Sequence, residues 1–255
     1  MDWNSPAGRI MFSVHKGLPR QGPGNLASTR RALEMIDGLP DVPSVLDIGS
    51  GPGMQTLDLA GLLPTARIQA VDALEPFIEQ GRQRAQNAGI TERVQFSIGD
   101  MHALDFEADQ FDLLWCEGAA YIMGISEALT AWRGLLKQGG TLAFTECVWL
   151  TDDPPQTLHD WWRDGYPGMG NVQACLDKVA NADYELTGHF VLPEMAWWDD
   201  YYKPMEARIA TLRIELEGDQ AALDALEEHQ REIDYYRRWS EHYGYLFVVC
   251  RRVER

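Results

Sequence analysis

Apolar residues follow two alternating patterns along the chain. Short continuous apolar runs, typical of strands buried on both faces, alternate with stretches in which apolar residues recur every three to four positions, as in helices. This alternation predicts βαβ units around a parallel sheet. The predicted strands are Val45–Ile48, Arg67–Val71, Val94–Ile98, Phe111–Cys116, Leu142–Cys147, Thr187–Leu192 and Tyr245–Cys250. The predicted helices are Met54–Leu63, Phe77–Ala88 and Ser126–Leu136, and another begins near Ser28.

Two excursions leave this alternating core. The first, residues 151–185, opens at Asp152–Pro155, where the sequence DDPP ends the fifth strand. The second separates the last two strands, and its helical pattern predicts a cap insertion at about 193–243. We therefore predict a single domain over 1–255. Its predicted parts are an N-terminal arm and helix (1–44), a cofactor-binding core (45–150), the excursion (151–185), and the last strands with the cap (186–255).

Composition and charge narrow the possible partners. The 255 residues are 45% hydrophobic and 24% charged, as in an ordinary globular protein. A net charge of -17 argues against binding of nucleic acid or anionic lipid, which relies on Lys and Arg. No apolar run approaches the roughly 18 residues of a membrane span, and the start MDWNSPAGRIMF lacks a signal-peptide layout. We predict a cytoplasmic protein without nucleic-acid or membrane partners.

The four cysteines indicate reduced thiols. Cys116, Cys147, Cys175 and Cys250 lie far apart, and three of them fall in apolar, strand-like runs. The sequence contains neither a C-x-x-C pair nor a tight His/Cys cluster. We predict no metal site.

A glycine-rich turn is the main candidate for chemistry. The segment Asp47–Gly53, DIGSGPG, follows a buried strand and opens a helix, and its glycines allow the backbone to approach a ligand closely. A tight turn without a ligand is the alternative. Asp72 ends the second strand about twenty residues on, where it can hold a ribose diol or merely cap the next helix. Asp100 ends the third strand and can accept from an adenine amino group, or it is a solvated turn residue.

The spacing of the glycines favours an adenosyl ligand without phosphate. A dinucleotide fingerprint, G-x-G-x-x-G, requires its third glycine at the position of Met54. The glycine turn also has no basic residue to meet a phosphate. Both features weaken the hypothesis of a nicotinamide cofactor and suit S-adenosylmethionine.

These segments resemble the motifs of class I S-adenosylmethionine-dependent methyltransferases, more narrowly the type 11 group. The matching segments are Val45–Gly53, Ala70–Ala73, Ser97–Leu104, Phe111–Tyr121 and Leu136–Ala143. The flanks resemble a poorly characterised bacterial branch of that group; they are His15–Gly24, Trp115–Tyr121, Pro193–Pro204 and Tyr243–Phe247. The resemblance implies an α/β fold with a Rossmann-like, seven-stranded, mostly parallel sheet, helices on both faces and an antiparallel last strand. It also implies the cofactor S-adenosyl-L-methionine and the product S-adenosyl-L-homocysteine.

The candidate site residues follow from the turn and the strand ends. The expected cofactor-binding residues are Arg20, Asp47, Gly49, Ser50, Gly51, Gly53, Gln55, Asp72, Ala73, Asp100, Met101 and Glu117. Arg20 and Lys16 are expected either to grip the cofactor carboxylate from the arm or to be surface charges. Glu117 ends the fourth strand, so it faces the cofactor's methionine part or the acceptor, or it is a salt-bridge partner. Glu117 and Tyr121 are the candidate catalytic residues, and His102 lies nearby.

The acceptor is the least constrained part of the prediction. Methyl transfer needs mainly proximity and orientation, so a general base is optional. The excursions interleave aromatic with acidic residues, which suits a hydrophobic or cationic small molecule or simply builds a cap core. The leading hypothesis is a small-molecule methyltransferase, active as a monomer or homodimer. The alternatives are a nicotinamide-dependent dehydrogenase and a non-catalytic adenosyl-ligand-binding protein.

Overall fold

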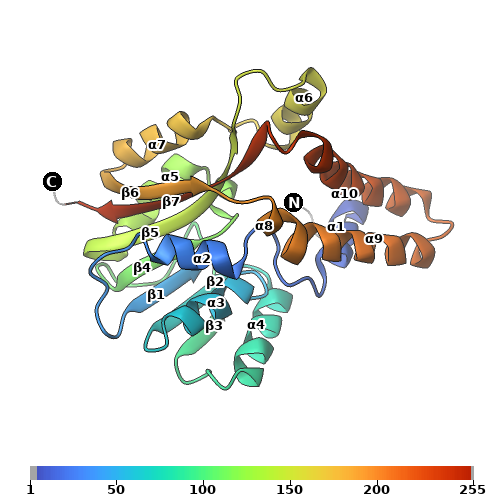
Figure 1. The fold of residues 1–255 in the computed structure, drawn as a ribbon. Coiled ribbons are helices and arrows are strands. Elements are labelled where there is room, and N and C mark those ends of the chain that lie inside the picture. The colour runs from blue at the N-terminus through green and yellow to red at the C-terminus, as the bar shows by residue number, and fades with distance from the viewer. Residues whose placement is uncertain (1–4, 254–255) are drawn as a thin grey trace.

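The computed structural model describes residues 5–253, which form one twisted sheet with helices on both faces and a helical cap at one end (Figure 1). Residues 1–4 and 254–255, at the ends of the predicted domain, lie outside the described residues. The strands are β1 (Ser44–Ile48), β2 (Arg67–Asp72), β3 (Val94–Ile98), β4 (Phe111–Cys116), β5 (Leu136–Trp149), β6 (Tyr184–Val191) and β7 (Tyr243–Arg252). Their order is β3-β2-β1-β4-β5-β7-β6, and β7 is antiparallel to both of its neighbours. The predicted fold class is confirmed.

The central strands are apolar throughout because both faces of the sheet are covered. Along β4, Leu114 joins one hydrophobic core while its neighbours Leu113 and Trp115 join the other. The first core packs under α5 (Ile125–Arg133) and α7 (Val172–Asn181), and the second packs under α3 (Met54–Leu62) and α4 (Glu75–Asn87). The helix α2 (Leu26–Leu33) lies beside α3 on that second face.

The cap lies at the carboxyl ends of the central strands. Its chain runs from β6 through α8 (Met195–Trp197), the π-helical segment η2 (Trp198–Tyr202), α9 (Lys203–Glu215) and α10 (Gln220–Trp239) into β7. The N-terminal helix α1 (Pro6–His15) packs against α9 and α10, and α6 (Gln156–Gly165) stands near the end of α10 (Figure 1). The N-terminal helix therefore packs onto the cap, while β7 runs away from the cap toward the C-terminal end (Figure 1). None of the helices within residues 5–253 is long and apolar enough to cross a membrane.

Several elements differ from the sequence prediction, and two of them show why. The arm contains α1, which was not predicted; Ser5 caps it by accepting a hydrogen bond from the Gly8 amide at 3.0 Å. The fifth strand is longer than the predicted Leu142–Cys147, because β7 pairs with it continuously from Thr141 to Trp149. Pairing with neighbouring strands, rather than the local apolar pattern, therefore determines where β5 begins and ends.

Candidate functional site

A cavity of about 390 Å³ opens at the carboxyl ends of β1, β2 and β4. In an open parallel sheet this is where ligands bind, because β1 and β4 are adjacent strands whose connections leave in opposite directions. The predicted site residues that line it are Arg20, Gly49, Ser50, Gly51, Gln55, Asp72, Ala73, Asp100, Met101, Glu117 and Tyr121, together with His102. The structure thus brings together residues from positions about 100 apart in the chain.

The glycine turn forms the floor of the cavity. Gly49 has a φ of 70°, and a Cβ there would lie 2.5 Å from the Cβ of Ala119, so only glycine fits. The amides of Gly49 and Ser50 both donate to the Val71 carbonyl at 2.9 Å, which fixes the turn against β2. The Ser50 hydroxyl is buried without a hydrogen-bond partner among the described residues. A polar ligand above the turn would satisfy it.

Asp72 both holds the turn and faces the cavity. Its Oδ2 accepts from the Gly51 amide and its Oδ1 accepts from the Leu74 amide, each at 2.9 Å. Burial raises the pKa of Asp72, and the backbone donors oppose that shift. Each carboxylate oxygen keeps a second acceptor position, so the side chain can both hold the turn that precedes α4 and accept from a ligand hydroxyl.

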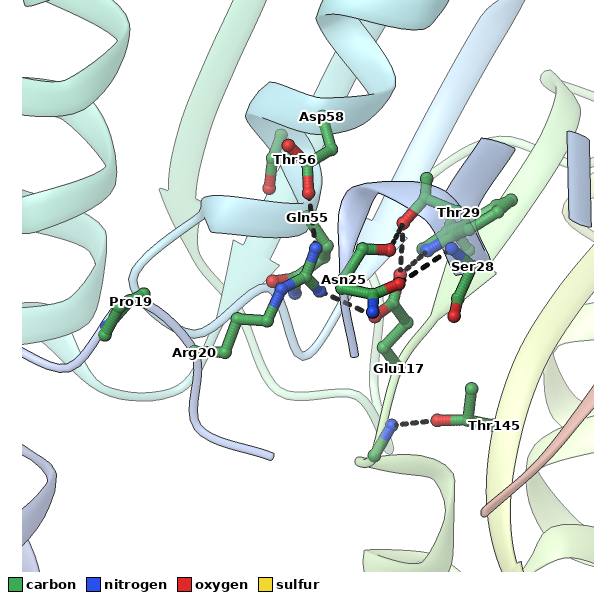
Figure 2. Close-up of polar contacts among 12 residues, drawn as sticks. Pro19, Arg20, Asn25, Ser28, Thr29, Gln55, Thr56, Asp58, Glu117 and Thr145 are labelled. Atoms are coloured by element: carbon green, nitrogen blue, oxygen red, sulfur yellow. Dashed lines mark hydrogen bonds and ion pairs between the residues drawn. The ribbon is translucent and has the colours of Figure 1, made fainter. Parts of the chain in front are cut away.

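Glu117 is the centre of a buried polar network (Figure 2). Its Oε2 accepts from Arg20 at 2.7 Å, and its Oε1 accepts from the Trp115 indole at 2.9 Å and the Thr29 hydroxyl at 3.3 Å. The Glu117 side chain is only 5% exposed. The other Arg20 terminal nitrogen pairs with Asp58 of α3. Glu117 therefore enters the cavity wall already paired with a cation.

The N-terminal arm reaches this network through Arg20. The guanidinium is 3% exposed and lies between two carboxylates, and its Nε has no partner among the described residues. Gly24 makes this approach possible, because a Cβ there would lie 2.5 Å from Glu117 Oε2. Arg20 is thus a buried part of the site. Lys16, the other expected arm residue, is exposed and does not line the cavity.

Two expected ligand contacts lie beside the cavity instead of lining it. Asp47 is fully buried and accepts from the Thr56 hydroxyl at 2.6 Å; burial raises its pKa to about 7. Gly53 begins α3 with a φ of 86°, and a Cβ there would lie 2.6 Å from the Phe96 ring. Asp47 therefore anchors the start of α3, and Gly53 allows close packing of β3.

The end of the cavity beside β3 is more open. Asp100 is 66% exposed, and its Oδ1 lies 2.8 Å from His102 Nδ1 and accepts from the His102 amide at 2.9 Å. These hydrogen bonds lower the pKa of Asp100. The carboxylate is held as an ionised acceptor at the rim of the cavity.

Several lining residues escaped the sequence analysis. Met11, Phe12 and His15 reach the cavity from α1, where Phe12 stacks on Phe77 of α4 with ring centroids 6.3 Å apart. Ile122, 56% exposed, stands at the mouth. The flank His15–Gly24 was the only sequence signal for this region, because nothing local reveals where α1 docks.

The aromatic residues that the sequence places in the excursions do not line the cavity. Trp197, Tyr201 and Tyr202 are buried in the core of the cap, where the Trp197 ring stacks on Tyr236 at 4.2 Å. None of the seven appears in its wall; they are Trp149, Trp161, Trp162, Trp197, Trp198, Tyr201 and Tyr202. The interleaved acidic residues are exposed or half-buried. Building a cap core is the main role of these aromatics.

The cysteines lie in the core. All four are buried and free of disulfides. Within residues 5–253 no three His, Cys, Asp or Glu side chains are grouped so that they could hold a metal ion.

The core of the chain is similar to known methyltransferases. Residues 45–140 match a family model described as a methyltransferase domain. A curated relative, the ubiquinone/menaquinone biosynthesis C-methyltransferase UbiE of Cereibacter sphaeroides, is 30% identical over 148 residues. That match covers 55% of this chain and 58% of the relative, so the chain spans a little over half the length of the relative it matches.

Solved structures share the fold over nearly the whole chain. A methyltransferase from Geobacter sulfurreducens, in complex with S-adenosyl-L-homocysteine, has a TM-score of 0.78 and 19% identity, covering 95% of this chain and 97% of that one. The [4+2]-cyclase SpnF has a TM-score of 0.72 and 19% identity, covering 97% of this chain and 93% of that one. The fold therefore occurs with more than one chemistry.

Proposed function

We propose, from the premise that residues 45–140 match a methyltransferase domain, that this protein is a class I methyltransferase that transfers the methyl group of S-adenosylmethionine to a small molecule. The observation that carries the proposal is the cavity itself. It combines a glycine floor, a carboxylate at the end of β2 and a buried Arg–Glu pair at the end of β4.

Each of these groups would bind a different part of the cofactor. Asp72 would accept from the ribose hydroxyls, and Asp100 from the adenine amino group. The methionine part carries an ammonium and a carboxylate, which match Glu117 and Arg20. The unpaired Ser50 hydroxyl and Arg20 Nε are the polar atoms that a bound ligand would satisfy.

When bound, the cofactor supplies an electrophilic methyl on a sulfonium. Transfer is an in-line displacement, in which the acceptor forms a bond to the methyl carbon while the carbon–sulfur bond breaks. The chain's own contribution is to orient the two reactants and to exclude water. Tyr121 and the α1 side chains wall the region beyond Glu117, where a hydrophobic or cationic acceptor would lie.

A second candidate is an adenosyl-ligand-binding protein that does not methylate. This second candidate is supported by the fold that the chain shares with the [4+2]-cyclase SpnF. Calorimetry with S-adenosylmethionine, S-adenosylhomocysteine and NAD separates the hypotheses, since we expect binding of the first two only. Saturable NAD binding without adenosyl-ligand binding would refute the proposal.

Turnover distinguishes methylation from binding alone. Incubation with labelled S-adenosylmethionine and a metabolite extract should give label in a small-molecule fraction and S-adenosylhomocysteine in equal amount. Tight cofactor binding with no label transferred would favour the second candidate.

A further inference from the structure

The cap side of the cavity contains a buried imidazole that no role above uses. His15 ends α1, lines the cavity and is 6% exposed. Its Nδ1 is buried and has no hydrogen-bond partner among the described residues. Buried polar atoms in native proteins are nearly always paired, so the wall has a polar atom available for a ligand.

The surroundings of His15 keep it uncharged. Its ring centroid lies 5.8 Å from that of His229 on α10 and 6.1 Å from that of Tyr201. Burial, with a smaller effect of His229, lowers the pKa of His15 to about 3, against the weaker opposing effect of a hydrogen bond with the Gln21 side chain. A neutral imidazole has one nitrogen with a free lone pair, which accepts from an N–H or O–H group.

The same region lies near two carboxylates, the half-buried Glu232 and the buried Glu146. Glu232 of α10 accepts from the Tyr202 hydroxyl at 3.0 Å and, at the limit of a hydrogen bond, from the Tyr201 hydroxyl at 3.5 Å. It forms no ion pair within the described part of the chain. Glu146 of β5 accepts from the Tyr166 hydroxyl and has Lys178 in its neighbourhood.

Tyr121 connects these carboxylates to the cavity. Its ring lies in the cavity wall and makes an edge contact with Tyr166, with centroids 5.6 Å apart. Burial raises the pKa of Tyr121, and Glu232 and Glu146 raise it further. Burial raises the pKa of Glu232 and raises that of Glu146 to about 7, so this wall gains a negative potential, which attracts cations, as the pH rises and these carboxyls ionise.

We infer that the acceptor is an amine and that His15 binds its nitrogen. The inference rests on the proposed function and specifies its substrate class. The ammonium form is drawn to the negative wall and to the face of Tyr121. It gives one proton to water, and a remaining N–H donates to His15.

The transfer then needs no protein base. The nitrogen lone pair forms a bond to the methyl carbon, the carbon–sulfur bond breaks, and its electron pair stays on sulfur. The products are a methylated ammonium and a neutral thioether. The positive charge moves from sulfur to nitrogen within one negative region. A hydroxyl acceptor would have to lose its proton, and a histidine with a pKa of about 3 is too weak a base to take it.

Three probes of equal shape test the inference: benzylamine, benzyl alcohol and benzoate, titrated into protein saturated with S-adenosylhomocysteine. We expect benzylamine to bind at least about tenfold more tightly than the other two. His15→Phe keeps a ring but removes both nitrogens, so it should weaken benzylamine binding by about tenfold, the usual cost of one hydrogen bond to a charged or strongly polar group. Affinity for S-adenosylhomocysteine should stay within about threefold.

Control variants separate binding from folding. His159→Phe alters a half-exposed histidine on α6 that does not line the cavity, so it should change nothing. His15→Asn keeps an accepting oxygen and should retain more benzylamine affinity than His15→Phe.

Three results would overturn the inference: preferred binding of benzyl alcohol or benzoate, no binding of benzylamine, or an unchanged benzylamine affinity in His15→Phe. An equal loss of S-adenosylhomocysteine affinity would assign His15 to the cofactor instead. Failure of the wild type to bind S-adenosylhomocysteine would refute the proposed function itself.

Discussion

At the scale of single residues, Asp72 links the glycine turn to the ligand. Asp72→Ala should weaken binding of S-adenosylhomocysteine by about 1–3 kcal/mol, since it removes a charged acceptor for the ribose hydroxyls. It also removes the partner of the Gly51 amide, so thermal unfolding should be measured in parallel. Isothermal calorimetry gives the affinity, with the exposed Asp105→Asn as control. Unchanged affinity for Asp72→Ala would remove Asp72 from the site.

Glu146 gives a second residue-scale prediction, on pH. Burial raises its pKa in the folded protein from 4.5 to about 7, against the opposing hydrogen bond from Tyr166. A carboxyl with a raised folded pKa contributes stability that is fully present below pH 4.5 and is lost as the pH rises through 7. Glu146→Gln should therefore gain about 1–3 kcal/mol relative to wild type between pH 4.5 and 7.5. The pKa values of Asp47 and His15 are also shifted, but both residues are present in wild type and variant, so their effects cancel in the difference.

Urea unfolding of both proteins across this pH range checks the prediction. A difference between wild type and variant that does not change with pH would show that Glu146 keeps its ordinary titration in the folded state.

At the scale of elements, α1 covers the cavity and meets the core through one ring contact. Phe12 on α1 stacks on Phe77 of α4, so the contact crosses the cavity from cap to core. Phe12→Ala should speed dissociation of S-adenosylhomocysteine by about threefold to tenfold, because such pairs contribute about 0.5–1.5 kcal/mol. Stopped-flow fluorescence measures the rate, with exposed Ile214→Ala as control. An unchanged rate would mean that α1 does not hold the ligand in.

Elements with strong local patterns were predicted well from the sequence. The fourth strand, Phe111–Cys116, was placed without error because each of its faces is buried and the run is apolar throughout. The glycine turn was predicted because its glycines lie between a buried strand and a helix, and the structure gives Gly49, Gly51 and Gly53 positive φ values. Local sequence could not place α1, whose position depends on contacts with α9 and α10 some two hundred residues away.

Pairings across the chain also escaped prediction. Arg20 and Glu117 were each expected to meet the cofactor, but their ion pair joins residues 97 positions apart and follows only from the folded arm. The aromatic residues of the excursions correctly indicated a cap, but they did not indicate the cavity wall. Aromatic residues occur both in hydrophobic cores and in ligand sites, so their presence in the sequence does not distinguish the two.

At the scale of the whole molecule, charge should limit stability. The chain has 39 acidic and 22 basic residues, and the resulting repulsion favours the unfolded state at low ionic strength. Raising sodium chloride from about 20 to 300 mM shortens the Debye length severalfold, so the melting temperature should rise by a few degrees. Scanning calorimetry at pH 7.5 tests this. A melting temperature that falls with salt would show that attractive surface pairs dominate.

The insertion point of the cap has a consequence for how such proteins diversify. The chain leaves the sheet at the end of β6 and returns at the start of β7, two antiparallel neighbours in which Val191 pairs with Leu246. The exit and the re-entry are therefore one strand spacing apart, as in a hairpin. A segment of almost any length can bridge that gap without disturbing β1 to β4, which carry the glycine turn and its carboxylates. The cap can thus be replaced as one continuous stretch of chain while the glycine turn is kept, and because no described residue of 193–243 lines the cavity, such a replacement would act on it through α1, which packs against α9 and α10.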